Sequence, residues 1–306
     1  MVIAVTGASG FLGRRVIKQL SPNFEVLALS RSPEDQPKLN GVVWVNSDSE
    51  AHLRELADQV TVVIHLATNY GRRLSDFLQV IDTNVNFPLK LFTLFDKADV
   101  FLYADSFYNR HPNNPRLPLY SATKRQFHEL VSMLWTKVDE PKPDLVRCVL
   151  QHVYGPGDSV EKLIPSLAHA LRLDMPFDFS SGSHIRDFIY VDDAASAITS
   201  IAHASVESKK TRPDLRAARC EYDIGTGRGT SVRELADLMA KIARSKSILR
   251  WGSLPDDPFE INSAIANNEA LVKIGWAAKV NLEDGLQATL EDARKFDSLP
   301  EENHVQ

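Results

Sequence analysis

The feature of this 306-residue chain that most constrains its fold is a run of glycines near its start. Gly7, Gly10 and Gly13 follow a short apolar run, Val2–Val5, whose β-branched residues predict a buried strand. The stretch after the turn, Phe11–Leu20, is apolar and basic, and it predicts a helix. Glycines let a backbone pass close to a pyrophosphate, and a helix N-terminus offers N–H groups to an anion. Strand, glycine turn and helix in this order therefore predict a phosphate cradle, although a tight turn alone could also require glycine.

Predicted strands and helices alternate over the first 150 residues. Such alternation is typical of parallel strands joined by right-handed crossovers, and it predicts an α/β fold, a Rossmann-type doubly wound parallel sheet. We expect this dinucleotide-binding domain over residues 1–150, with strand–helix segments 186–204 and 222–243 returning to it, and a smaller C-terminal substrate domain mainly over 151–306. The expected strands are Val2–Val5, Glu25–Leu29, Val42–Val45, Val60–His65, Val100–Tyr103 and Leu145–Leu150. The expected helices are Phe11–Leu20, Ala51–Asp58, Leu74–Leu94 and Ser121–Lys137.

Composition narrows the class of protein. A hydrophobic content of 43% and a net charge of −5 suit a soluble α/β enzyme, and the acidic balance argues against nucleic acid as the main partner. There is no long apolar stretch, and Met1 leads straight into a strand, so we expect no membrane association and a cytoplasmic protein. Cys148 and Cys220 lack the spacing of a metal site, which predicts two buried thiols and no bound metal.

The end of the second expected strand bears on the choice between NAD and NADP. In this architecture a carboxylate there binds the adenosine ribose and selects NAD, but the chain reads S-R-S at 30–32 and has no carboxylate before Glu34. Arg14 follows the third glycine, and guanidinium groups bind phosphate oxygens in a forked geometry. The sequence therefore favours NADP(H), with Arg14 and Arg31 at the 2′-phosphate. NAD(H) remains possible, since Arg31 could be merely solvated, and Asp48 is placed to accept from the adenine amine.

Tyr120 and Lys124 form a Y-x-x-x-K pair at the start of an expected helix. Residues four apart project from one helix face, and a lysine cation beside a phenol favours the phenolate. Tyr120 could then donate or accept a proton at a carbinol carbon, and Lys124 could also hold the nicotinamide ribose. Such pairs occur by chance on many helices, but the position after a dinucleotide fold and a fifth strand favours catalysis.

Taken together, the ordered motifs resemble those of the extended short-chain dehydrogenases/reductases, in the NAD-dependent epimerase/dehydratase family, over nearly the whole chain. The motifs are T-G-A-S-G-F-L-G (6–13), I-H-L-A-T (64–68), D-T-N-V (82–85), Y-S-A-T-K (120–124), H-V-Y-G-P-G-D (152–158), I-R-D-F-I-Y-V-D-D (185–193) and G-T-G-R-G-T-S-V (225–232). Within the family, A-D-S-F, T-K-R-Q-F, V-Y-G-P-G-D and A-N-N are most similar to the branch of the CDP-abequose synthases. That branch implies reduction of the 4-keto group of a CDP-3,6-dideoxyhexose with NADPH. The family also implies a homodimer formed through helices 74–94 and 121–137.

The resemblance implies roles for further residues. Asn84 matches a structural asparagine near the nicotinamide, and His152 stands where relatives often carry Asn at the substrate. Arg186 matches the arginine that clamps the diphosphate, unless it forms a salt bridge with Asp187 or Asp192. The residues implied at the cofactor are Gly7, Gly10, Phe11, Leu12, Gly13, Leu66, Ala67, Thr68, Asn84, Tyr120 and Lys124.

The chain departs from the family pattern after the fifth strand and near residues 255–260. In the family, a catalytic Ser or Thr hydroxyl follows the fifth strand. The closest alignment places that position at Ala104, which has no hydroxyl, whereas counting from the strand places it at Ser106. Ser106 is therefore the candidate that holds the substrate oxygen. The A-D-S triplet also lacks the glutamate with which 4,6-dehydratases eliminate. Where relatives carry a second diphosphate-binding arginine, the chain reads D-D-P-F-E, and Arg250 is the candidate replacement.

These expectations favour an NADP(H)-dependent nucleotide-sugar 4-ketoreductase. A 4-epimerase, which keeps and recycles a bound cofactor, is the nearest alternative. A non-catalytic NADP-binding sensor is a third, which Ala104 favours and the pair of Tyr120 and Lys124 opposes.

Overall fold

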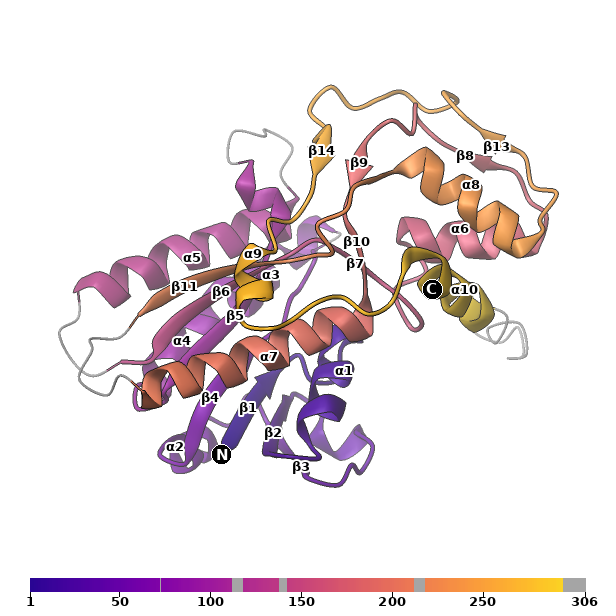
Figure 1. The fold of residues 1–306 in the computed structure, drawn as a ribbon. Helices are drawn as coiled ribbons and strands as arrows, with labels where there is room; N and C mark the ends of the chain where they lie inside the picture. The colour runs from indigo at the N-terminus through magenta and orange to yellow at the C-terminus, as the bar shows by residue number, and fades with distance from the viewer. Residues whose placement is uncertain (72, 112–117, 138–141, 212–217, 294–306) are drawn as a thin grey trace. The chain divides into compact units, whose positions relative to one another are not determined.

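The structure is a computed structural model that describes residues 1–71, 73–111, 118–137, 142–211 and 218–293, and its chain forms two compact units (Figure 1). Each unit gathers segments from separate parts of the sequence. The first unit comprises Met1–Leu150, Ala194–Ile224 and Asn268–Ala277. The second unit comprises Gln151–Asp193, Gly225–Asn267 and Ala278–Gln306.

A parallel seven-stranded sheet forms the centre of the first unit, in the order β11-β6-β5-β4-β1-β2-β3. Its strands are β1 (Val2–Thr6), β2 (Glu25–Ser30), β3 (Val42–Asn46), β4 (Val60–His65), β5 (Val100–Ser106), β6 (Asp144–Leu150) and β11 (Arg219–Ile224). From β1, the chain adds strands first on one side and then, from β4 onward, on the other. The predicted doubly wound fold is confirmed, and its change of direction between β1 and β4 is where such sheets bind ligands, outside the carboxyl ends of the strands.

Helices cover this sheet. They are α1 (Phe11–Leu20), α2 (Glu50–Ala57), α3 (Phe77–Ile81), α4 (Phe87–Leu94), α5 (Leu119–Lys137), α7 (Val191–Lys210, in this unit from Ala194 onward) and α9 (Glu269–Lys273). Buried side chains of α2, α4 and α5, among them Leu53, Leu91 and Phe127, join one core cluster with Phe101 and Tyr103 of β5. Figure 1 shows α7 running along the sheet.

The expected helix 74–94 is interrupted. A short 3₁₀ turn precedes α3, and a π-helical turn, Asp82–Asn86, separates α3 from α4. Two local causes are visible: Pro88 has no N–H to bond back into the preceding turn, and the buried Asn84 side chain bonds outside the helix. Turns of this kind often mark functional sites, and Asn84 lies inside this one.

The second unit is smaller and is built on α6 (Leu163–Arg172), α8 (Val232–Ala243) and α10 (Leu282–Ala293). Leu167, Leu235 and Leu286, one from each helix, are fully buried in a shared cluster. Short strands complete it: β7 (His152–Tyr154) beside β10 (Phe188–Tyr190), β13 (Leu249–Arg250) beside β8 (Phe177–Asp178), and β9 (Ile185–Arg186) between β12 (Thr230–Ser231) and β14 (Ser263–Ala264).

The two segments expected to return to the sheet are each divided between the units. From 186–204, β10 pairs with β7 in the second unit, whereas α7 belongs to the first from Ala194 onward. From 222–243, β11 extends the sheet beside β6, whereas α8 buries its apolar face against α6 and α10. The sequence pattern identifies each strand and helix but not its partner, because an apolar face can pack on any complementary face.

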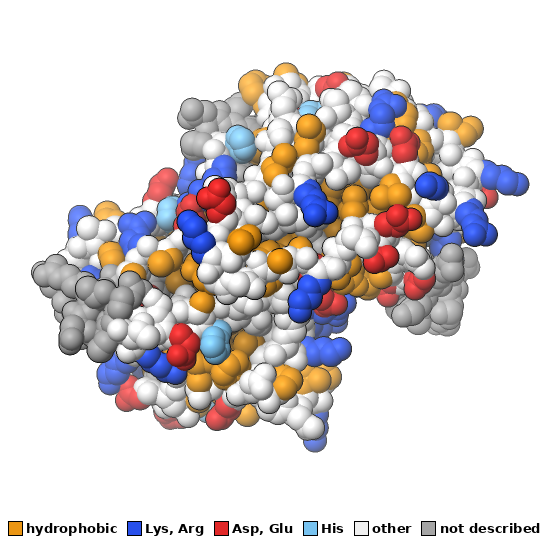
Figure 2. Space-filling view, in the orientation of Figure 1, with side chains coloured by type: hydrophobic (Ala, Val, Ile, Leu, Met, Phe, Trp, Pro, Cys, Tyr) orange, Lys and Arg blue, Asp and Glu red, His pale blue; other side chains and the backbone are white. Residues whose placement is uncertain are grey.

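Acidic and basic side chains are interspersed on the face that Figure 2 shows. Among the described helices, none is both long enough and apolar enough to span a bilayer. Cys148 is buried as predicted, but the prediction for Cys220 is wrong, because it lies exposed on the edge strand β11; neither cysteine forms a disulfide.

Candidate active site

The glycine turn after β1 packs too closely for larger residues. Gly7 has a φ of +64°, and a Cβ atom there would lie 2.7 Å from the Ala67 nitrogen. At Gly13 a Cβ atom would lie 2.0 Å from the Gly7 oxygen, so α1 rests directly on the turn. The Gly10 N–H donates to the Gly7 carbonyl at 2.9 Å, and no side chain caps α1. A helix N-terminus without a side-chain cap, next to a turn whose glycines carry no side chain, fits a pyrophosphate.

Hydrogen bonds to Thr6 fix the loop after β4 beside this turn. The Thr6 hydroxyl oxygen lies 3.2 Å from the nitrogens of Leu66 and Ala67, which donate to it, and 2.8 Å from His65 Nδ1. The Thr68 hydroxyl donates to the Leu66 carbonyl. Burial, with the nearby Lys124 charge, lowers the pKa of His65 well below its usual value, so its ring is neutral. Of the residues predicted along the cofactor, Leu66 and Ala67 thus lie against Gly7, and Thr68 is bonded to Leu66.

The residues predicted at the adenosine end lie at the same edge of the sheet. β2 and β3 end together, with Ser30 opposite Asn46, and they run parallel to β1. Arg31 and Asp48 follow these strands as exposed side chains, and Arg14 is exposed on the first turn of α1. The structure therefore brings all of these side chains to the carboxyl edge of the sheet.

The pair predicted to be catalytic lies on the first turns of α5. Lys124 is buried, and its ammonium group donates to the Ala104 carbonyl at 2.8 Å. Burial lowers the pKa of Lys124 to about 8, while Asp105 acts in the opposite direction. The Tyr120 ring is flanked by the rings of Tyr70, at a centroid distance of 4.8 Å, and Tyr108, at 6.5 Å. The lysine is thereby fixed to the end of β5, one helical turn from the phenol.

Asn84 joins α5 to the loop after β4. Its side-chain oxygen accepts from the Asn69 N–H at 2.8 Å, and its amide donates to the Asn69 carbonyl at 2.8 Å and to the Thr123 hydroxyl at 3.0 Å. Thr123 precedes Lys124 on α5. In this structure Asn84 therefore links the loop after β4 to the segment that carries Tyr120 and Lys124, the pair predicted to be catalytic.

β5 is longer than predicted and includes Ala104 and Ser106. Because side chains alternate along a strand, Ala104 and Ser106 share one face and Asp105 lies on the other. Ser106 ends the strand, and its hydroxyl accepts from the Tyr108 N–H at 3.4 Å. The structure thus places a hydroxyl one pleat beyond Ala104, at the end of the strand that Lys124 touches.

A buried ion pair beside this site was not foreseen from the sequence. Asp105 accepts from Arg147 Nε at 2.7 Å and pairs with its Nη2 at 2.6 Å, while its other oxygen accepts from the Ser106 N–H. Arg147 also reaches Glu221 on β11. A usable signal was present, since charged residues within otherwise apolar strands of a parallel sheet need a partner.

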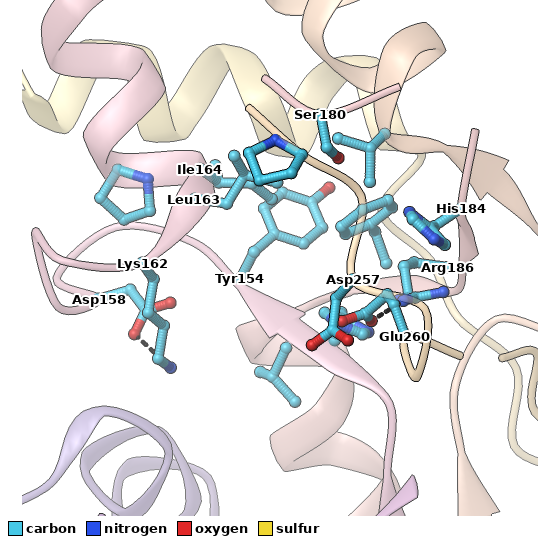
Figure 3. A pocket seen from close by; sticks show the side chains of 16 residues that line it. Tyr154, Asp158, Lys162, Leu163, Ile164, Ser180, His184, Arg186, Asp257 and Glu260 are labelled. Atoms are coloured by element: carbon cyan, nitrogen blue, oxygen red, sulfur yellow. Dashed lines mark hydrogen bonds and ion pairs between the residues drawn. The ribbon is translucent and has the colours of Figure 1, made fainter. Parts of the chain in front are cut away.

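The second unit holds a cavity of about 340 Å³ with Arg186 in its wall (Figure 3). Arg186 is buried and donates to the carbonyls of Ile185 and Ile261, and it forms an ion pair with Glu260. The alternative partner Asp187 instead accepts from Thr226, Gly227 and Ala266. The cavity is lined by His152, Val153, Tyr154, Asp158, Lys162, Leu163, Ile164, Pro165, Ser180, His184, Arg186, Phe188, Val232, Pro255, Asp257 and Glu260.

The structure does not bring Arg250 to this cavity. β13 pairs with β8 so that Arg250 lies opposite Asp178, and the two form a bidentate ion pair with N–O distances of 2.8 Å on the surface. The second cation of the cavity is Lys162, which pairs with Asp158 at 2.8 Å. His152, predicted to contact the substrate, lines this cavity; burial, together with the charges of Arg186 and Lys162, lowers its pKa to about 3, so it is neutral.

Comparison with known proteins agrees with this geometry. A family model described as "NAD dependent epimerase/dehydratase family" matches residues 3–214. The chain belongs to the NAD-dependent epimerase/dehydratase family. It is thereby an NAD(P)-dependent nucleotide-sugar oxidoreductase of the short-chain dehydrogenase/reductase type.

Relatives cover this epimerase/dehydratase chain almost from end to end. A CDP-abequose synthase of Salmonella typhimurium is 33% identical over 300 residues, which are 94% of this chain and 97% of that protein. A UDP-glucose 4-epimerase of Thermotoga maritima, solved with UDP-glucose, has a TM-score of 0.77 at 19% identity and covers 97% of this chain and 99% of its own. A UDP-glucuronic acid 4-epimerase of Bacillus cereus, solved with UDP-glucuronic acid and NAD, has a TM-score of 0.76 at 20% identity, covering 97% and 100%. The two epimerase structures share the fold of this chain.

Proposed function

We propose that this epimerase/dehydratase-family protein reduces the 4-keto group of a CDP-linked deoxyhexose with NADPH. The observation that carries the proposal is the 33% identity to a CDP-abequose synthase over nearly the full length of both proteins. Two features of the site support a reduction. Tyr120 and Lys124 supply a proton donor and its cation, and the A-D-S triplet has no glutamate for elimination. Asp105, the acid within that triplet, is bound by Arg147.

Different residues would bind the cofactor, donate the proton and hold the substrate in the proposed reaction. The Gly7–Gly13 turn and Leu66–Thr68 would hold the dinucleotide, which when bound supplies the hydride to C4. Tyr120 would donate a proton to the C4 oxygen, and Lys124, protonated below its pKa of about 8, would stabilise the phenolate left behind. Ser106 would bind the same oxygen. Arg186 would hold the diphosphate after releasing Glu260.

A deuterium-transfer experiment tests the reaction. The protein is given a CDP-linked 4-keto-3,6-dideoxyhexose and NADPH that carries deuterium at the transferred position. Because a reductase moves one hydride and one proton and stops, we expect one deuterium at C4 of each product molecule and one NADP⁺ per sugar. Mass spectrometry of the sugar and absorbance of the cofactor measure the two quantities.

The other functions give different results in the same experiment. A 4-keto sugar needs one hydride per molecule to become an alcohol, so an epimerase would give no net reduction of it. Absence of that reduction, together with interconversion of the two C4 epimers of a CDP-linked 4-hydroxy deoxyhexose with only catalytic cofactor, would replace the reductase with a 4-epimerase. Tight NADPH binding without turnover of any nucleotide sugar would instead indicate the NADP-binding sensor and give weight to Ala104 as a lost hydroxyl.

Arg31→Ala tests the proposed choice of NADPH. If Arg31 binds the 2′-phosphate, its loss removes a charged hydrogen bond worth roughly 1.5–3 kcal/mol, or about a 10- to 150-fold weaker Kd for NADPH. NADH lacks that phosphate, so its Kd should stay nearly constant. Fluorescence titration with both cofactors measures the difference.

Lys18→Ala is the matched control, because it removes another exposed cation of the same unit, on α1. It should leave both affinities near those of the unchanged protein. Equal weakening of NADPH and NADH by Arg31→Ala would show that Arg31 acts on the fold or the adenine and not on the 2′-phosphate.

A further inference from the structure

A buried carboxylate holds the start of the turn that follows β5. One oxygen of Asp105 accepts from the Ser106 N–H at 2.7 Å and from Asn109 Nδ2 at 2.5 Å. The Ser106 hydroxyl in turn accepts from the Tyr108 N–H at 3.4 Å, at the beginning of the 3₁₀ turn Phe107–Arg110. A single carboxylate oxygen therefore fixes both the backbone of Ser106 and the third residue of the turn.

A guanidinium group holds the same carboxylate from the neighbouring strand. The other Asp105 oxygen accepts from Arg147 Nε at 2.7 Å and pairs with Nη2 at 2.6 Å. The remaining nitrogen, Nη1, donates to Glu221 Oε2 at 2.7 Å, because Arg147 lies opposite Glu221 in the pairing of β6 with β11. The side chains of Asp105 and Arg147 are 1% and 12% exposed, so neither charge has much water to replace a lost partner.

Glu221 continues this connection to the far end of the turn. Its second oxygen, Oε1, pairs at 2.5 Å with Nη1 of Arg110, the last residue of the turn. Arg110 also forms an ion pair with Asp223, which shares a face of β11 with Glu221. Asp105, Arg147, Glu221, Arg110 and Asp223 are the ion-pair network. Within it, Glu221 joins the two arginines, and the network thus grips the turn at both ends.

We propose that Glu221 is a positioning residue, which through the ion-pair network holds the turn after β5 and so fixes the Ser106 hydroxyl. This inference rests on the proposed function, in which Ser106 binds the C4 oxygen. Glu221 lies on the edge strand and acts through the two arginines. A group that stabilises a developing charge needs a fixed position, because a displacement of about 1 Å can lower a rate by as much as about 100-fold.

Glu221→Gln tests the role with a small change at an exposed position. Glutamine keeps one oxygen acceptor but replaces the other with an NH₂ donor, so one of the two arginines loses its acceptor. We expect kcat to fall by about 10-fold. The KM for the CDP-linked 4-keto-3,6-dideoxyhexose and the Kd for NADPH should stay nearly constant, since the network contacts neither the glycine turn nor Arg186.

A double-mutant cycle with Ser106→Ala separates positioning of the hydroxyl from general support of the fold. Ser106→Ala alone should lower kcat by about 100-fold, as expected when a donor to a developing oxyanion is removed. If Glu221 acts through that hydroxyl, adding Glu221→Gln to Ser106→Ala should lower kcat by less than about 2-fold more. A residue with a merely structural role would instead lower kcat equally in both backgrounds.

Amide hydrogen exchange provides a readout that does not require turnover. The N–H groups of Ser106, Tyr108 and His111 all donate within this segment. They should exchange faster in Glu221→Gln, which mass spectrometry of peptides from residues 106–111 measures. Glu207→Gln is the matched control, because it removes another exposed carboxylate of the same unit, paired with Lys210 on α7. It should leave both the exchange and kcat unchanged.

Three results would overturn the positioning role of Glu221. They are an unchanged kcat in Glu221→Gln, an equal loss of kcat with and without the Ser106 hydroxyl, and unchanged exchange over residues 106–111. If the unchanged protein reduced no CDP-linked 4-keto sugar, the proposed function would be rejected instead. The exchange measurement would then still decide whether Glu221 holds the turn.

Discussion

Tyr120→Phe is expected to lower kcat by at least about 100-fold, because a positioned general acid typically contributes that much or more. The substitution removes only the phenolic hydroxyl. The ring remains to pack against Tyr70 and Tyr108, and the Lys124 contact with the Ala104 carbonyl does not involve it. Binding of NADPH should therefore change little, which separates a lost proton donor from a disturbed cofactor site.

The measurement is kcat under saturating sugar and NADPH, with the Kd for NADPH measured in parallel. Tyr222→Phe, on the edge strand β11, is the matched control and should keep its activity. If Tyr120→Phe kept most of its turnover, another group would have to protonate the substrate oxygen, and the assignment of Tyr120 would be wrong.

Asp187→Ala is expected to lower the free energy of unfolding by about 2–4 kcal/mol, since it leaves backbone donors without their acceptor. Asp187 is fully buried, and its carboxylate accepts from the N–H groups of Thr226, Gly227 and Ala266 at 2.9–3.2 Å. It thus ties together three separate segments of the second unit. Its neighbour Arg186 lines the cavity, so CDP binding should weaken as well.

Urea unfolding followed by circular dichroism measures this loss, and calorimetric titration measures the Kd for CDP. Asp237→Ala removes an exposed carboxylate of α8 in the same unit and should change the unfolding free energy by no more than about 0.5 kcal/mol. An Asp187→Ala protein as stable as this control would show that the donors find other acceptors.

Features set by local sequence were predicted well. The glycine turn, the strand before it and the helix after it follow from residues that adjoin in the chain, and their bounds agree closely with the structure. Tyr120 and Lys124 are four residues apart on a helix that begins two residues earlier than expected. Periodicity and turn chemistry act over such short spans.

The partners of charged side chains and the residues that line the cavity could not be predicted from local sequence, because they depend on contacts between distant segments. Arg250 was the candidate for a second diphosphate-binding arginine, but the register of β13 on β8 places it opposite Asp178. Arg186 took Glu260 as its partner because the loop before β14 approaches β9. Lys162 and His184 line the cavity without any motif to announce them, since a pocket wall depends on tertiary placement.

The edge strand β11 lies much later in the sequence than β6, the strand with which it pairs. Translation proceeds from the N-terminus, so β6 emerges from the ribosome well before the strand that will cover its outer edge. Until Arg219–Ile224 follows, the nascent sheet presents a row of unpaired backbone groups along β6, and such an edge can pair with another chain. The first segment of the second unit, Gln151–Asp193, is synthesised in this interval. A fragment ended after Leu150 would keep that open edge permanently, so a single cut there retains the glycine turn, Tyr120 and Lys124 but removes the strand that covers β6.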